Sequence, residues 1–179
     1  MVTINRPEAT DKALSASFQQ SRSRVFARQG MVATAHPLAT AAGLDALRRG
    51  GTAMDAAIAA ALVTTVVLPA MCGLGGDAFY IHAEGKTGKV TAMNSSGIAP
   101  RALSRDYFVS RGYQKMPFFG PHSPGIPGSV AGYFEAINRH CRLSVDDLFS
   151  AAIHYAENGF PLSATGARTI RASRDELVK

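Results

Sequence analysis

The segment Thr52–Pro69, "TAMDAAIAAALVTTVVLP", constrains the fold more than any other part of the sequence. Thr52 suits a helix N-cap, and Asp55 stands three residues later, which is the spacing of a capping box. The residues that follow are apolar on nearly every side of a helix, and Pro69 ends the segment. A helix of this kind is usually buried within a protein larger than 179 residues. The sequence therefore predicts a central helix that this chain alone does not cover completely.

The elements around this helix predict a mixed α and β domain without internal repeats. Residues 1–28 form a polar N-terminal arm, and 29–179 form one domain. Gly30–His36 is expected to be a strand, and Pro37 begins a helix that ends at Gly50. Two strands follow from Ala78, with a turn at Gly85–Gly88. Further helices are expected after the caps Ser104, Ser144 and Ser163, the first of them running to Arg111, and another is expected to start at Ser129. Frequent alanine predicts helices that lie close together.

The stretch "MCGLGGDAFYI", Met71–Ile81, holds three glycines in four positions. A Walker-type phosphate loop would continue with Lys and Ser or Thr, and this stretch does not. A dinucleotide-binding loop would lie between a strand and a helix, whereas this one follows a helix and precedes a strand. Asp77 would also repel a phosphate. The glycines are therefore interpreted as a backbone corner that lets another segment approach closely.

Net charge and cysteine content exclude several classes of protein. The formal net charge is +6, but the positive residues are scattered and do not alternate with aromatic ones, which disfavours nucleic-acid binding. The two cysteines, Cys72 and Cys141, have neither CxxC nor zinc-ligand spacing, and so few thiols are typical of a reducing compartment. The N-terminus has no apolar signal region, and no apolar run is long enough for a confident membrane span. We expect a soluble, cytoplasmic protein.

Tests for catalytic residues and cofactors find no complete set. The five histidines show no metal-binding spacing, and no cofactor is predicted. Asp146 and Asp147 fall in the first turn of a helix, where capping is the expected role. Cys72 at the glycine corner has no histidine placed to activate it. The residues alone assign no catalytic group.

The order of motifs resembles the gamma-glutamyltransferase family. "GMVATAHPLATAAGLDALRRGGTAMDAAIAAAL" is followed by "LPAMCGLGGDAFYI" and later by "GIPGSVAGYFEAINRHCRLSVDDLFSAAIHYAENGFPLS". These motifs are similar to the N-terminal part of the large subunit of that family, in the same order, from about Gly30 to Lys179. Motifs that match in one order indicate the family much more strongly than they indicate a substrate.

The resemblance implies an α+β fold of the N-terminal-nucleophile hydrolase type, an αββα sandwich that is incomplete in this chain. In that family a precursor cleaves itself ahead of a threonine, whose freed amine serves as the base for its own hydroxyl. The threonine attacks an amide, and water or an amine then takes the acyl group. The resemblance places this threonine beyond residue 179, so the expected partner is the remaining precursor or a small subunit that carries it. A homodimer or heterodimer and a small-molecule amide substrate are also expected.

One departure from the family pattern concerns the loop "NSSGIAP", Asn94–Pro100. Transpeptidases of the family carry Asp-x-Arg-Glu-x-Ala-Pro here, and their arginine holds the α-carboxylate of the glutamyl group. Ser96 replaces that arginine, so Asn94, Ser95 and Ser96 are the candidate substrate-binding residues, for a neutral or smaller group such as oxamate. Alternatively, Ser96 is an ordinary loop residue and an arginine from elsewhere binds the substrate. A different class, a non-catalytic remnant that binds a small molecule or a partner, also stays open.

Overall fold

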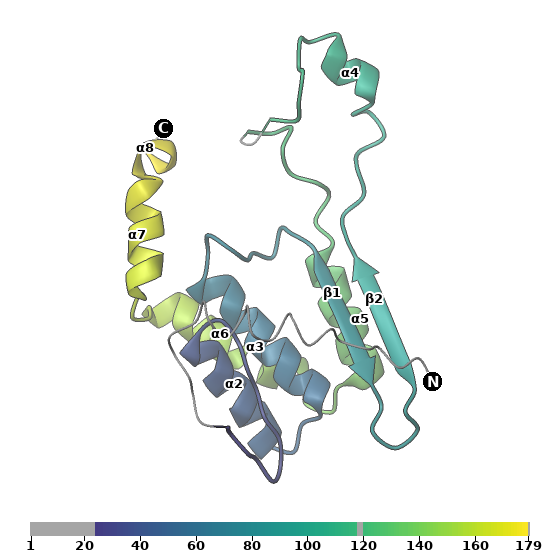
Figure 1. Cartoon of the computed structure of the whole chain (residues 1–179), viewed down its shortest axis with the longest axis vertical. Coiled ribbons are helices and arrows are strands. Elements are labelled where there is room, and N and C mark those ends of the chain that lie inside the picture. The colour runs from purple at the N-terminus through teal and green to yellow at the C-terminus, as the bar shows by residue number, and fades with distance from the viewer. Residues whose placement is uncertain (1–23, 118–119, 179) are drawn as a thin grey trace, which may run out of the picture.

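The apolar segment forms the central helix of the molecule. The protein is represented by a computed structural model, which describes residues 24–117 and 120–178. Helix α3, Ala53–Val67, contacts α2, α5 and α6 and carries the fully buried side chains of Leu62 and Val63 (Figure 1). The Thr52 hydroxyl accepts the N–H groups of Met54 and Asp55, and the capping box is present. The prediction of a buried, capped helix is confirmed.

Helix α2, Pro37–Arg48, packs closely against α3. It begins at Pro37 as predicted, and Nδ1 of His36 caps it by accepting the N–H of Leu38 at 3.2 Å. A Cβ atom on Gly43 would lie 3.0 Å from the carbonyl oxygen of Ala56 on α3. Small residues therefore permit the close helix packing that the alanine content predicted.

The strand predicted at Gly30–His36 is wrong. Residues 30–34 belong to no helix or strand in the structure. A strand requires a hydrogen-bonded neighbour, and within residues 24–117 and 120–178 the strands β1 and β2 pair only with each other. Val32 packs instead against the helical core. Most of the predicted arm, residues 1–28, lies outside the described residues.

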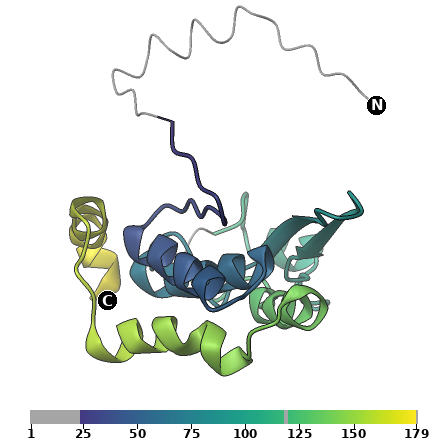
Figure 2. The same cartoon turned by 90° about the horizontal axis from the view of Figure 1, so that it is seen from below.

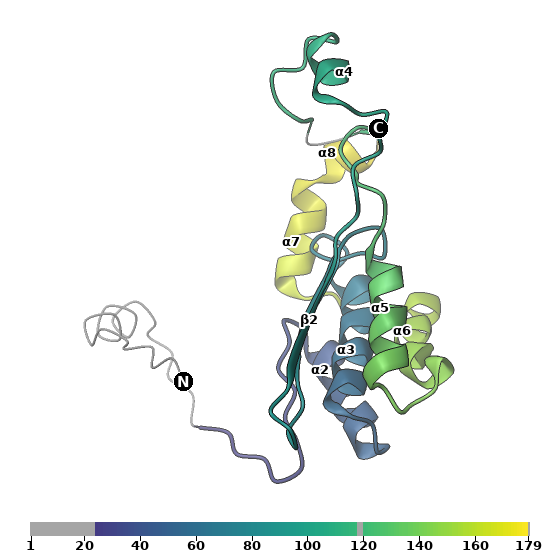
Figure 3. The same cartoon turned by 90° about the vertical axis from the view of Figure 1, so that its right-hand side faces the viewer.

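Strands β1, Ala78–Ala83, and β2, Val90–Ser95, form an antiparallel hairpin. Ala78 lies opposite Ser95 and Ala83 opposite Val90. The predicted turn is present, with Gly88 at φ +71°. Figure 3 shows the hairpin edge-on, with α5, Ser129–His140, along one side of it. The hairpin is thus a sheet supported by α5 on one face.

The remaining helices lie around this centre. Helix α6, Val145–Asn158, packs under α3, as Figure 2 shows from below. Ser144 and Asp147 form its capping box, which confirms the capping role predicted for Asp147. Helix α4, Arg105–Val109, stops two residues short of the predicted Arg111 and projects on a long loop. Helices α7, Ala164–Ala172, and α8, Arg174–Leu177, stand apart from the other helices, and α7 has no buried residue.

Candidate functional site

The loop after β2 carries the candidate substrate-binding residues, and side-chain hydrogen bonds fix its shape. The side-chain oxygen of Asn94 accepts the backbone N–H of Ser96 at 2.9 Å. The carboxylate of Asp77, immediately before β1, accepts the N–H of Gly97 at 2.8 Å. Asn94 and Ser96 are both exposed, so the structure brings these two candidates together on the surface.

Ser95 has a different position from its two neighbours. Its half-buried hydroxyl donates a 2.7 Å hydrogen bond to the carbonyl oxygen of Gly128, just before α5. A Cβ atom on Gly132, one turn into α5, would lie 2.7 Å from the Cβ of Ser95. Ser95 therefore ties β2 to α5, while Asn94 and Ser96 remain accessible to a ligand.

The glycine corner docks onto the first residues of α5. The carbonyl oxygen of Gly76 accepts the N–H groups of Gly128 and Ser129, at 3.1 and 2.9 Å. The buried hydroxyl of Ser129 donates to the carbonyl oxygen of Leu74 at 2.5 Å. In these bonds the corner supplies carbonyl oxygens, which hold the start of α5. The stretch is a structural corner leading into a strand, as predicted.

The predicted reason for its glycines, that another segment approaches too closely for a side chain, is wrong for all three. A Cβ atom on Gly76 would make only an ordinary 3.5 Å contact with the carbonyl oxygen of Gly73, in the same stretch. A Cβ atom on Gly73 or Gly75 would meet nothing within 4 Å in the described part of the chain. The close approach occurs at other glycines: a Cβ on Gly97 would overlap the carbonyl oxygen of Ile126, and one on Gly128 would overlap that of Ser95. The candidate loop and the segment before α5 are therefore in direct backbone contact.

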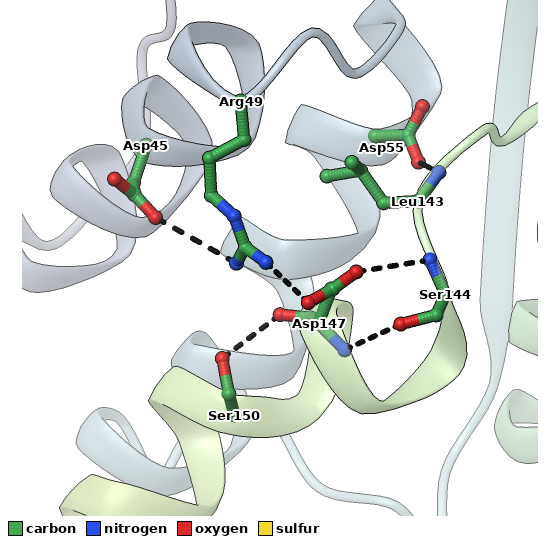
Figure 4. Close-up of polar contacts among 7 residues, drawn as sticks. All are labelled: Asp45, Arg49, Asp55, Leu143, Ser144, Asp147 and Ser150. Atoms are coloured by element: carbon green, nitrogen blue, oxygen red, sulfur yellow. Dashed lines mark hydrogen bonds and ion pairs between the residues drawn. The ribbon is translucent and has the colours of Figure 1, made fainter.

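Asp55 joins the start of α3 to the segment between α5 and α6. The sequence predicted only its role in capping α3. Its buried carboxylate accepts the N–H groups of Thr52, Arg142 and Leu143 and the hydroxyl of Thr52. Burial raises the pKa of Asp55, but these hydrogen bonds together lower it below its ordinary value. Figure 4 shows Asp55 beside the loop that leads into α6.

A second polar contact joins α2 to α6 near the same place. Arg49, which follows α2, forms an ion pair with Asp147 in the first turn of α6 (Figure 4). A hydrogen bond from Ser144 and the contact with Arg49 lower the pKa of Asp147. Since Arg49 and Asp147 are partly exposed, the pair contributes little to stability. Asp55 and Asp147 thus each cap a helix and join it to a neighbouring part of the chain.

The two cysteines and the other potential metal ligands were also located in residues 24–117 and 120–178. Cys72 is exposed, and Cys141 is half-buried near Asp55. In the described residues no group of three or more His, Cys, Asp or Glu side chains is placed to hold a metal ion. None of the helices described is both long and apolar enough to cross a membrane.

The structure also groups histidines that sequence spacing did not relate. His82 on β1 stacks on His140 at the end of α5, with ring centroids 4.2 Å apart. His122 lies between the hydroxyls of Tyr107 and Tyr113. Only the fold brings these residues together, so no local signal in the sequence was available to find them.

Comparison with known proteins identifies the class and then the family. The chain is 38% identical to the cephalosporin acylase from Bacillus halodurans, with a TM-score of 0.84 over 89% of this chain and 30% of that one. It is 34% identical to a glutathione hydrolase proenzyme from Bacillus subtilis, over 91% of this chain and 28% of the relative. It is 36% identical to an oxamate amidohydrolase proenzyme from Klebsiella pneumoniae, over 83% of this chain and 29% of the relative.

These relatives define a class of amide-cleaving enzymes, and the mixed helix and strand architecture agrees with the N-terminal-nucleophile hydrolase fold expected for it. The sequence profile of the gamma-glutamyltranspeptidase family matches residues 39–179. The chain belongs to this family, which confirms the resemblance seen in the sequence. It spans less than a third of the length of the relatives above.

Proposed function

We propose that this chain is the N-terminal segment of a self-processing amide hydrolase or acyltransferase. The bond cleaved is a gamma-glutamyl-like amide or a small carboxamide. The nucleophilic threonine lies outside this chain, in the remaining precursor or in a small subunit. Family membership and the short span relative to the matched proteins support this proposal.

The observation that carries the proposal is the uncovered face of the hairpin. Phe79, Ile81 and Val90 point away from α5 and are 65%, 78% and 62% exposed. Burial of apolar surface contributes about 25 cal/mol per Å², so a second layer on this face would stabilise the fold. A second sheet there completes the αββα sandwich, and α7, with no buried residue, offers another surface to the same missing part.

The proposed reaction proceeds through an acyl-enzyme. The threonine hydroxyl attacks the amide carbonyl carbon while the threonine amine takes the hydroxyl proton. That proton passes to the leaving nitrogen as the C–N bond breaks. Water or an acceptor amine then attacks the ester and releases the acyl group. The exposed loop of Asn94 and Ser96, held by Asp77, contributes to binding of the acyl part.

Ser96 is proposed to select an acyl group without the glutamyl α-carboxylate. A serine hydroxyl donates and accepts hydrogen bonds, which suits a neutral carboxamide. A charge-assisted bond from arginine contributes about 1.5–3 kcal/mol, so its absence weakens glutamyl binding roughly tenfold to a hundredfold. Oxamate is the smaller substrate of this kind, because its carboxylate is attached directly to the amide carbonyl and it has no glutamyl α-carbon. Hydrolysis by the full-length protein is expected to favour oxamate over gamma-glutamyl-p-nitroanilide.

The Ser96→Arg variant tests this assignment. The substitution is expected to raise kcat/KM for gamma-glutamyl-p-nitroanilide at least tenfold, mainly through KM, and to lower it for oxamate. Ser150→Arg, which adds the same charge on the exposed side of α6, serves as the matched control. Equal effects of the two variants on both substrates would show that Ser96 does not contact the acyl group.

A further inference from the structure

A cavity of about 590 Å³ lies next to the candidate loop, between that loop and the segment that carries α4. Gly97 and Pro100 line one side, and Phe108, Tyr113, His122 and Pro124 line others. Gly97 directly follows Ser96 in the chain. The volume falls within the range of about 300–1,000 Å³ that is usual for small-molecule sites. A ligand held near Ser96 could therefore extend into this cavity.

Aromatic contacts fix the wall of the cavity. Nε2 of His122 lies 3.1 Å from the Tyr107 hydroxyl, and its Nδ1 lies 3.3 Å from the Tyr113 hydroxyl. The rings of Tyr107, Phe108 and Tyr113 all meet the imidazole edge-on, with centroids 5.6–5.9 Å away. Phe108 is 9% exposed. Edge-to-face pairs of this kind stabilise one arrangement of rings, so the wall is formed before any ligand arrives.

The electrostatic character of the lining favours an anion. Arg105 and Lys115 line the cavity, and the described residues that line it include no Asp or Glu. Most of the remaining lining is apolar, with Leu103, Val109 and Met116 beside the rings. Apolar walls with cations nearby suit a flat apolar group that carries a carboxylate.

We propose that this cavity binds an aromatic carboxylate group as one part of the amide substrate. The inference rests on the proposed function, because it assigns the cavity to the substrate whose scissile bond lies near the loop of Asn94 and Ser96. In this assignment the carboxylate is bound by Lys115, with Arg105 as a second cation in the lining, and not by a residue at position 96. The substrate class is thus an amide with an aromatic, negatively charged substituent.

Calorimetric titration of the full-length protein with three probes tests the proposal. Phenylacetate carries the ring and the charge, phenylacetamide carries the ring alone, and acetate carries the charge alone. Phenylacetate is expected to bind at least tenfold more tightly than either of the others. Higher salt is expected to weaken phenylacetate binding more than phenylacetamide binding.

Two variants locate the binding. Lys115→Gln is expected to weaken phenylacetate about tenfold and to leave phenylacetamide unchanged. Val109→Trp fills the cavity from an exposed position of α4 and is expected to weaken both aromatic probes. Lys86→Gln removes an equal charge from the hairpin turn and is the matched control. Unfolding midpoints equal to that of the parent protein show that each variant is folded.

The outcomes separate this inference from the function it rests on. Equal affinity for the three probes, no probe binding at all, or insensitivity to both cavity variants would overturn the aromatic-anion site. Absence of binding is also the result expected if the rest of the precursor fills the cavity. Probe binding by a protein that never forms an N-terminal threonine would support the cavity and contradict the proposed function. A matured, active enzyme that binds no probe would contradict the cavity alone.

Discussion

The carboxylate of Asp55 on α3 accepts a 2.9 Å hydrogen bond from the backbone N–H of Leu143, a residue 88 positions further along the chain. The N–H of Arg142 also donates to this carboxylate, and the Thr52 hydroxyl oxygen lies 2.9 Å from the carbonyl oxygen of His140. The N-terminus of α3 is thereby joined to the link between α5 and α6. Since α5 supports the hairpin, the geometry of the candidate loop depends indirectly on Asp55.

Replacing Asp55 with alanine is expected to destabilise the protein strongly. The substitution removes the acceptor for three backbone N–H groups in a fully buried place. One buried donor left without a partner costs about 1–3 kcal/mol, so we expect a loss of about 3 kcal/mol or more. Urea denaturation followed by circular dichroism measures it. Asp146→Ala, on the exposed first turn of α6, is the control and is expected to cost less than about 1 kcal/mol.

The same carboxylate gives the protein a defined response to acid. The pKa of Asp55 is lower in the folded protein than its ordinary value of 3.8, so the unfolded state binds the proton more readily. This contribution to stability is therefore complete above about pH 4 and is lost as pH falls through the folded pKa. Unfolding free energies measured between pH 2 and 6 are expected to show this loss. If the unfolding free energy of Asp55→Asn falls with pH as steeply as that of the parent protein, groups other than Asp55 cause the loss.

The two cysteines are expected to differ in reactivity toward iodoacetamide. Burial, and then the neighbouring Asp55, raise the pKa of Cys141 to about 12, whereas Cys72 is exposed. Because the thiolate is the reactive form, Cys72 is expected to be alkylated well before Cys141 at pH 8. Peptide mass spectrometry at timed intervals measures both rates. In guanidinium chloride the two rates are expected to become similar, and a difference that persists there would contradict the structural explanation.

The close contact of Gly97 with the segment before α5 predicts a specific steric effect. Alanine at 97 places a Cβ against the carbonyl oxygen of Ile126, so one of the two backbones must move. Overpacking of this kind costs about 1–3 kcal/mol, and kcat/KM for the amide is expected to fall with it. Gly85→Ala is the matched control, because its Cβ would meet nothing within 4 Å. Similar unfolding midpoints and similar kcat/KM values for the two variants would contradict the tight packing of the loop.

The sequence correctly predicted the helix ends and turns that depend on residues close together in the chain. The Thr52–Asp55 and Ser144–Asp147 capping boxes, Pro37 at a helix start and the turn before Lys89 all depend on neighbouring residues, and all are present. The strand at Gly30–His36 was predicted from β-branched residues, but a strand also needs a partner, which the described residues do not supply. The contacts of Asp55 with Leu143 and of His122 with two tyrosines join distant positions, so no spacing in the sequence reveals them.

The sequence likewise predicted only part of the candidate site. The family motif drew attention to Asn94, Ser95 and Ser96, and the structure adds that Ser95 already donates its hydroxyl hydrogen to Gly128. The cavity beside Gly97 depends on the path of a long loop rich in proline, which local propensities do not determine. The roles of Asn94 and Ser96 in substrate binding remain predictions, and the Ser96→Arg variant tests the second of them.

The central claim is that this chain is one part of a precursor that cuts itself ahead of a nucleophilic threonine. Intact mass and N-terminal sequencing of the purified full-length protein test it most directly. We predict two fragments, the larger containing residues 1–179 and the smaller beginning with threonine, and we predict that replacing that threonine with alanine leaves the precursor whole. A single uncut chain that hydrolyses the amide at full rate would contradict the claim.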